Sequence, residues 1–261
     1  VEGKTAADLV STNMTTGANP SGVLAIDAET NDAGEYTGGT FVGSVENINN
    51  VLADGYVYNA ADNTVKADTS VVAKIGDTEY ATLPEAIKAA TTGATIVLLE
   101  NITLSSAQSI SGKTLTLDLN GKTLSSTAYQ TIKLNSNADL TVKDSVGNGK
   151  ITNSYTGVAT TVYLYRYGNI NFTLESGTIE SNPSSTSFKT TAIERSNDCT
   201  GCTVNINGGS VVVPEVATDG RAIVAGENMT LNISGGTVAG GLHGVDAYSG
   251  SNVTITGGEI T

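Results

Sequence analysis

Short stretches of alternating apolar and polar residues recur along the C-terminal part of the chain, and each ends in a glycine turn. Each stretch reads apolar, polar, apolar, polar, turn, glycine, polar, apolar. Because successive side chains of a strand point to opposite faces, this period of two predicts strands with one buried face. The pattern is clearest in four segments: Phe172–Ile179, Val204–Val211, Leu231–Val238 and Val253–Ile260.

The spacing of these turns predicts the fold. Looser copies of the pattern lie at Leu115–Leu124 and Leu140–Ile151, and the turn glycines follow one another at intervals of 22 to 32 residues. One coil of a parallel β-helix needs about three short strands and three turns, or roughly 20 to 30 residues. We therefore predict an all-β protein that forms a right-handed parallel β-helix, a type of solenoid.

A second strand pattern precedes each of these turns by about ten residues and is followed by asparagine. Asparagine and glycine both tolerate the left-handed backbone that sharp corners require. Stacked coils should place the asparagines in a row, with their amides in hydrogen-bonding range. The strand and asparagine pairs are Ile132–Leu134 with Asn137, Val162–Leu164 with Asn169, Ala222–Val224 with Asn228, and Val245–Ala247 with Asn252.

A short amphipathic helix is predicted at residues 82–90, before the first strands of the β-helix. Thr82 and Glu85 have the spacing of a capping box, and Pro84 lies in the first turn, where no backbone donor is missed. The apolar side chains share one face. A helix there would cover the open N-terminal end of the coil stack.

Residues 1–75 are predicted to be separate from the β-helix of residues 76–261. Val23–Ile26 and Tyr36–Gly43 repeat the coil pattern, and Gly55–Tyr58 and Asn63–Lys66 flank a turn in the manner of a hairpin. We interpret residues 1–75 as the end of an upstream β-helix unit that finishes in a hairpin. The alternative is a segment packed on the last coil of the main solenoid, or on a neighbouring molecule. Because the last pattern stops at Thr261, residues 76–261 are interpreted as a truncated β-helix.

Charge and hydropathy restrict the partners. The formal net charge is −13, which disfavours binding to nucleic acid and to anionic membrane surfaces. Since no apolar run approaches 18 residues, membrane insertion is not expected. The sequence contains no motif for a cofactor or a metal, and neither is expected. We expect Cys199 and Cys202 to form a small disulfide that braces an unusually long turn, as suits an exported protein.

Several segments resemble a known group of proteins. The stretch Ala73–Ala90, followed by Gly93–Leu104, resembles the opening of β-helix modules in large surface proteins of gut-type Gram-positive bacteria. Leu115–Leu124 and the Ser-Gly-Gly-Thr repeats resemble the same group. The resemblance covers residues 70–261, with an echo at 20–67. It implies the pectin-lyase-like superfold, an extracellular location, either secreted or on the cell surface, and an adhesin-like role. It implies no single activity, because that superfold serves enzymes, adhesins and inert stalks.

Two sets of residues are candidates for function. Tyrosine and arginine are enriched in recognition surfaces, so we predict a ligand-binding patch. Lyases and glycosidases on this fold require clustered carboxylates and a base, so a second set is an alternative catalytic cluster. The binding set is Tyr163, Tyr165, Arg166, Tyr167 and Tyr248; the alternative catalytic set is Glu194, Arg195, Asp198, Asp219, Arg221, His243 and Asp246.

These observations favour a non-enzymatic surface module that binds a host or microbial surface protein or glycan, or that serves as a spacer. The alternative hypothesis is a polysaccharide lyase or glycoside hydrolase that acts on an acidic polysaccharide. Gly241–Gly244 resembles a catalytic Gly-His-Gly only superficially, and His243 is the one histidine in the chain. No catalytic residue is therefore assigned.

Overall fold

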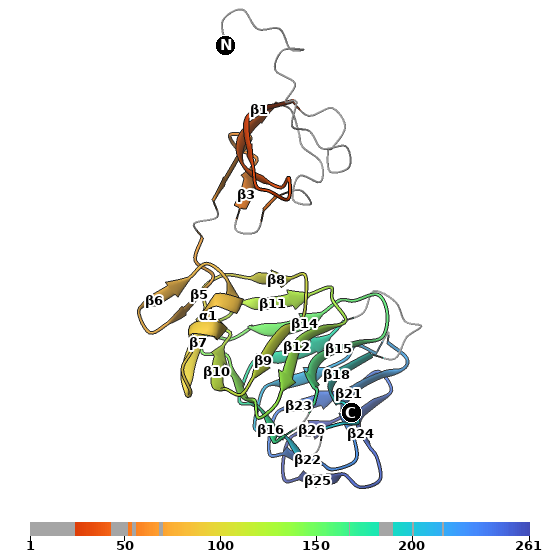
Figure 1. Cartoon of the computed structure of the whole chain (residues 1–261). Helices are drawn as coiled ribbons and strands as arrows, with labels where there is room; N and C mark the ends of the chain where they lie inside the picture. The colour runs from red at the N-terminus through yellow and green to blue at the C-terminus, as the bar shows by residue number, and fades with distance from the viewer. Residues whose placement is uncertain are drawn as a thin grey trace, which may run out of the picture. The chain divides into compact units, whose positions relative to one another are not determined.

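The chain divides into two compact units, Val1–Ser70 (unit 1) and Val71–Thr261 (unit 2). A computed structural model gives their architecture (Figure 1). It describes residues 24–42, 52–53, 56–67, 70–166, 168–182, 190–199, 201–215 and 217–261.

Unit 1 contains a four-stranded sheet whose paired strands are all antiparallel. The order across the sheet is β1 (Leu24–Thr30), β2 (Tyr36–Val42), β4 (Thr64–Ala67) and β3 (Tyr56–Asn59). Phe41 is buried in it, and the rings of Tyr36 and Tyr58 meet the Phe41 ring edge to face at 5.2 and 6.0 Å.

The antiparallel pairing bears on the interpretation of residues 1–75. Strands β3 and β4 form the hairpin expected between Gly55 and Lys66. The two segments with the coil pattern, however, are β1 and β2, which pair with each other in antiparallel fashion, whereas coils of a β-helix pair in parallel. That this unit ends an upstream β-helix stays a prediction. The division between the units falls before Val71, because β5 (Ala73–Ile75) pairs with β7 (Ala94–Leu98) of unit 2.

Unit 2 is a parallel β-helix, and the strands in Figure 1 follow one another down the stack from yellow to blue. Its nine-stranded sheet is parallel except at β5 and β6. The order is β25 (Asn252–Ile255), β22 (Met229–Ile233), β19 (Cys202–Ile206), β16 (Ile170–Leu174), β13 (Asp139–Lys143), β10 (Thr114–Asp118), β7, β5 and β6 (Thr78–Tyr80).

Two further parallel sheets complete the coils. The seven-stranded sheet has the order β26 (Glu259–Ile260), β23 (Thr237–Ala239), β20 (Ser210–Val212), β17 (Thr178–Ser181), β14 (Lys150–Asn153), β11 (Thr123–Ser126) and β8 (Ile102–Leu104). The six-stranded sheet has the order β24 (His243–Ala247), β21 (Gly220–Ala225), β18 (Thr190–Arg195), β15 (Ala159–Leu164), β12 (Gln130–Asn135) and β9 (Gln108–Ser111).

The predicted inward residues form the core. Phe172, Leu174 and Ile179 are fully buried, as are their counterparts one and two coils later. The outward residues form polar columns instead. The amide of Asn205 donates to the Thr173 hydroxyl at 3.3 Å, and the amide of Asn232 donates to the Asn205 side-chain oxygen at 2.9 Å. Alternation at period two therefore separates the core from a hydrogen-bonded outer column.

The N-terminal end of the core is closed by α1 (Leu83–Ala89). Its capping box is formed by Thr82 and Glu85, as predicted, and Leu83, Ala86 and Ile87 are buried against the core. The far end of the helix is closed from another coil, because the ammonium of Lys113 donates to the carbonyls of Ile87, Lys88 and Ala90 at 2.7 to 2.9 Å. These are carbonyls that a helix C-terminus leaves without partners.

The glycine turns are required by close stacking. Gly236 has a φ of +78°, and a Cβ atom placed on it would lie 2.5 Å from the carbonyl oxygen of Gly209 in the preceding coil. That oxygen accepts a hydrogen bond from the Thr237 N–H at 2.9 Å. The backbones of successive turns thus touch, and only glycine fits between them.

A buried carboxylate, Asp118, holds the corresponding turns of two earlier coils. Asp118 accepts hydrogen bonds from the backbone N–H groups of Asn120 and Ser145, each at 3.0 Å, and lies 3.4 Å from the Lys143 ammonium. Burial alone would raise the pKa of Asp118, but these hydrogen bonds outweigh it, so its pKa lies below the usual value. Asp118 therefore joins two coils in its ionised form.

Candidate binding surface on the six-stranded sheet

The outer face of the six-stranded sheet carries one column of large polar side chains. Lys133 of β12 lies opposite Tyr163 of β15, which lies opposite Glu194 of β18. Their neighbours Val162 and Leu164 are fully buried in the core. Because side chains alternate along a strand, Tyr163 faces outward, as the sequence predicts.

Two tyrosines and two cations meet at the end of β15. The rings of Tyr163 and Tyr165 are tilted, with centroids 5.9 Å apart. The Lys133 ammonium lies 4.0 Å from the centroid of the Tyr165 ring, and the Arg166 guanidinium carbon lies 4.6 Å from it. Such cation–π contacts hold an aromatic ring in place at a surface.

The phenol of Tyr163 is kept in its neutral form. Burial is the main cause that raises its pKa, and the nearby carboxylate of Glu194 raises it further. A neutral phenol both donates and accepts hydrogen bonds.

A pocket of about 510 Å³ opens beside this column, at the C-terminal ends of β18, β21 and β24. This volume lies within the range of small-molecule sites, about 300–1,000 Å³. The ring of Tyr248, which is 52% exposed, stands on its wall. The pocket is also lined by Glu194, Arg195, Asn197, Val224 and Glu227.

Arg195 is held in one orientation at this pocket. One of its terminal nitrogens donates to the Ser196 carbonyl at 2.6 Å, and its Nε atom is buried without a hydrogen-bond partner. The guanidinium packs directly against Gly226, where a Cβ atom would overlap with its Nε atom. A guanidinium at the wall of a pocket suits recognition of an oxygen-bearing ligand through its terminal nitrogens.

The pocket draws on both sequence-predicted sets. Tyr248 comes from the predicted binding patch, and Glu194 and Arg195 come from the alternative catalytic cluster. Asn197, Glu227 and Ser249 were not predicted, because they lie in turns without periodicity. Tyr167 of the predicted patch lies outside the described residues.

The rest of the alternative cluster lies in two other groups. Arg221 of β21 pairs with Asp219 and with Asp246, each at 2.7 Å. Burial would lower the pKa of Arg221, but the two carboxylates outweigh it and raise its pKa. Arg221 is thus a cation clamped between coils rather than a base. His243, its neighbour in register on β24, is exposed.

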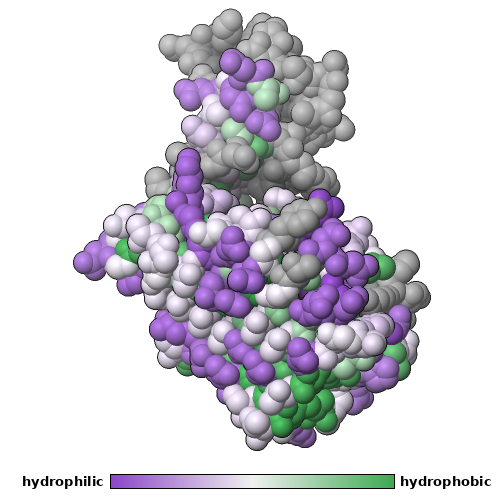
Figure 2. All heavy atoms as spheres, turned by 60° about the horizontal axis from the view of Figure 1, so that its bottom comes forward, coloured by the Kyte–Doolittle hydropathy of each residue, from purple (hydrophilic) through white to green (hydrophobic). Residues whose placement is uncertain are grey.

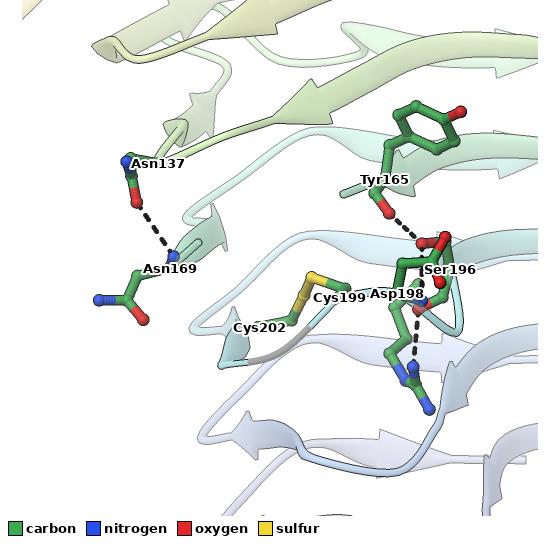
Figure 3. Close-up of a disulfide and its surroundings, with 8 residues drawn as sticks. Asn137, Tyr165, Asn169, Ser196, Asp198, Cys199 and Cys202 are labelled. Carbon is green, nitrogen blue, oxygen red and sulfur yellow. Dashed lines mark hydrogen bonds between the residues drawn. A yellow bond between two sulfur atoms is a disulfide. The ribbon is translucent and has the colours of Figure 1, made fainter. Parts of the chain in front are cut away.

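Asp198 belongs to a different contact, in the turn that carries the cysteines. It lies 3.4 Å from Arg166, the residue that stacks on Tyr165. In the same turn the Ser196 hydroxyl donates to the Tyr165 carbonyl, and a disulfide joins Cys199 to Cys202 (Figure 3). Both cysteines are buried. The turn that contains Asn197 is therefore hydrogen-bonded to Tyr165 at one end and closed by the disulfide at the other.

Two members of the predicted asparagine row, Asn137 and Asn169, lie beside this turn. The side-chain oxygen of Asn137 accepts a hydrogen bond from the backbone N–H of Asn169 at 3.1 Å (Figure 3). Asn137 and Asn228 have the left-handed backbone that the sequence indicates for these corners. In this pair the backbone N–H donates to the side-chain oxygen, and the predicted bond between two side-chain amides is not the one observed.

A second aromatic pair, missed from the sequence, lies next to the column. Tyr129 precedes β12 and Tyr155 follows β14, and their rings meet edge to face at 6.3 Å. Tyr129 is 49% exposed, and Val158 beside β15 is also exposed. Single tyrosines in turns carry no sequence signal until the coil register brings them together.

Within the described ranges, no three acidic, histidine or cysteine side chains gather in a way that would hold a metal ion. The same part of the chain contains no helix that is long and apolar enough to cross a membrane. The fold defines the chain as a parallel β-helix protein with a tyrosine- and arginine-lined surface. Comparison of the chain with protein-family models, curated proteins and solved structures found no match in any of the three.

Proposed function

We propose that this chain is a non-enzymatic, exported cell-surface module that binds a ligand in an adhesin-like manner. One observation carries the proposal. The chain has three arginines, Arg166, Arg195 and Arg221, and all three lie on the six-stranded sheet or in the turns that follow its strands. On a protein of net charge −13, Arg195 lines the pocket and Arg166 lies against the ring of Tyr165.

Such a surface suits recognition. Tyrosine and arginine supply large contact areas and directed hydrogen bonds, and both dominate binding hot spots. The partner that fits is a surface protein or glycan of a host or of a microbe. The pectin-lyase-like superfold, which the sequence resembles, is proposed as the family background, and an extracellular location accords with the disulfide.

The test is binding of the full chain to glycan and protein arrays, followed by affinity measurement for any partner found. We expect Tyr248→Ala and the double change of Tyr163 and Tyr165 to alanine each to weaken binding at least about tenfold. Lys88→Ala is the matched control, because Lys88 is exposed on α1 at the other end of the solenoid. Absence of binding to every array, or equal losses in the control, would refute the proposal and favour a passive spacer.

The alternative, a polysaccharide lyase or glycoside hydrolase, has one observation in its favour, since Glu194, Glu227 and Arg195 line the same pocket. Paired carboxylates are what glycoside hydrolysis requires. This alternative predicts product release from acidic polysaccharides that Glu194→Gln abolishes and Asp219→Asn leaves intact, because Asp219 lies outside the pocket with Arg221.

A further inference from the structure

The pocket at the C-terminal ends of β18, β21 and β24 is lined by hydrogen-bonding groups of both kinds. The Arg195 guanidinium supplies only donors, and the carboxylates of Glu194 and Glu227 supply only acceptors. The Asn197 amide and the Ser249 hydroxyl supply both. A ligand that satisfies this lining must therefore donate at some points and accept at others.

The pocket is formed by stacked coils. Glu194 of β18 lies opposite Val224 of β21. Val224 is 5% exposed and Gly226 is buried, so these small residues leave room between the longer side chains of the lining. Six of the eight lining residues, including all the charged ones, belong to the coils of β18 and β21, and each of these coils has another coil on either side. The charges of the pocket are therefore set inside the stack.

Two of the charged groups are held in place before any ligand binds. The Thr160 hydroxyl donates to the Glu194 carboxylate at 3.3 Å, and a terminal nitrogen of Arg195 donates to the Ser196 carbonyl at 2.6 Å. Groups whose orientation is fixed in advance lose less conformational entropy on binding. The arrangement of donors and acceptors around the pocket is thus part of the folded structure.

The signs of these charges disfavour a charged ligand. A carboxylate in the pocket would approach Glu194 and Glu227, and an ammonium group would approach Arg195. Like charges brought together across an interface weaken binding. A hydroxyl group meets no such penalty, because it donates to a carboxylate and accepts from a guanidinium. The lining therefore favours an uncharged ligand that carries several hydroxyl groups.

The remaining wall suits the apolar side of such a ligand. Tyr248 presents an aromatic ring at the pocket, and the C–H face of a sugar ring is apolar enough to pack against it. On the face of unit 2 drawn in Figure 2, hydrophilic and intermediate residues dominate the side, and hydrophobic residues gather at the lower end. Because the buried core of a protein interface is apolar, a side of this kind suits a hydrophilic ligand better than a protein.

We propose that this pocket binds an uncharged sugar of a glycan and discriminates against sugars that carry a carboxylate. The inference rests on the proposed function, because it names the ligand class of the same binding surface. The volume of about 510 Å³ suits a ligand of a few sugar rings. The net charge of −13 acts in the same direction, because it repels acidic polysaccharides. An acidic polysaccharide, the substrate of the alternative function, therefore fits this pocket poorly.

The test compares pairs of short oligosaccharides that differ at one carbon of each sugar. Each pair is a neutral oligomer of glucose, galactose or mannose and the uronic acid oligomer of the same linkage, in which a carboxylate replaces the C6 hydroxymethyl group. Binding to the full chain is measured by titration calorimetry at low and high ionic strength. We expect a neutral oligomer to bind and its acidic counterpart to bind at least about tenfold more weakly. Salt should strengthen binding of the acidic member alone, because it screens the repulsion.

Two outcomes overturn the proposal and leave the proposed function standing. One is equal or tighter binding of the acidic member of a pair. The other is binding of a protein or an acidic glycan by a chain that binds no neutral glycan. Absence of binding to every oligosaccharide and every array partner refutes the proposed function as well.

A matched pair of variants tests whether the discrimination arises in the pocket. Glu227→Gln keeps the size of the side chain and removes one of the two like charges, so the acidic oligomer should gain at least about threefold in affinity while the neutral one changes little. Glu100→Gln removes the same charge from an exposed position in the turn between β7 and β8, and should leave the ratio of the two affinities unchanged. Equal shifts in both variants would show that net charge alone discriminates, and would overturn the proposal.

A second pair of variants locates the site. Ser249→Trp should fill the pocket from an exposed position and weaken binding of the neutral oligomer at least about tenfold. Ser105→Trp adds the same bulk at an exposed turn of the first coil and should have no effect. Circular dichroism of each variant checks that the solenoid is folded. Unchanged binding by a folded Ser249→Trp variant would place the sugar elsewhere and overturn the proposal.

Discussion

Replacement of Gly236 by alanine tests whether stacked glycine turns hold the coils together. Two costs add. An alanine in the left-handed region costs about 1–2 kcal/mol. Its Cβ atom would also lie 2.5 Å from the Gly209 carbonyl oxygen, so the two turns must separate. Separation stretches the 2.9 Å hydrogen bond from the Thr237 N–H to that oxygen and leaves buried polar groups unsatisfied, at about 1–3 kcal/mol. We expect Gly236→Ala to lower the free energy of unfolding by about 3 kcal/mol.

Gly93 is the matched control. It also has a positive φ, +83°, but a Cβ atom on it would meet nothing within 4 Å. Gly93→Ala should therefore cost only the backbone term, about 1–2 kcal/mol. The assay is denaturant unfolding of the full chain followed by circular dichroism, with the transition of unit 2 compared between the two variants. Equal losses in both would refute the reasoning, since they would show that contact between turns contributes nothing.

Three further changes test other contacts. Asp118→Asn should lower stability by about 2 kcal/mol at neutral pH, because it removes a charged acceptor shared by two coils. Since the pKa of Asp118 is lowered in the folded state, the extra stability of the wild type over Asp118→Asn should be complete above about pH 4 and should vanish as the pH falls through the folded pKa. A difference in unfolding free energy that stays constant across this pH range would contradict the prediction. Arg221→Met should lower the free energy of unfolding by about 2 kcal/mol, because Asp246, which is 21% exposed, loses its partner. An unchanged free energy in urea unfolding would show that this ion pair does not stabilise the fold. Replacing both Cys199 and Cys202 by serine should cost about 2 kcal/mol from loop-closure entropy, and in the native protein thiol labelling after mild reduction should be slow, because both sulfurs are buried; rapid labelling would contradict this.

The repeating part of the fold follows from local rules that the sequence displays directly. Phe172 and Leu174 are buried because they occupy alternate positions, and the capping box of Thr82 and Glu85 depends on residues three apart. Unit 1 shows the limit of the same rule. Alternation in β1 and β2 predicts strands, but it does not determine whether neighbouring strands run parallel or antiparallel.

The site was harder to predict because it depends on register between coils of unequal length. Arg221 and Asp246 are 25 residues apart, and their pairing requires the length of the intervening turns. Asn197 and Glu227 line the pocket from turns whose sequences have no hydrophobic periodicity. Lys113 directly precedes β10 and closes α1 after an intervening coil, and no local sequence pattern marks it. Tyr163 was predicted because it stands within a strand, where facing is determined by alternation.

The cap at the N-terminal end has a consequence for the order in which unit 2 folds. Strand Ala73–Ile75 pairs with Thr78–Tyr80 across a two-residue turn, whereas the pairing of Leu115 with Ala94 must first close a loop of about twenty residues. We therefore expect the hairpin and the helix to form before the first coil, which then provides a template for the next coil. Folding would proceed in the direction of synthesis, so that the emerging chain meets a completed edge. Substitutions near the cap should slow folding, and substitutions in the last coil should mainly accelerate unfolding.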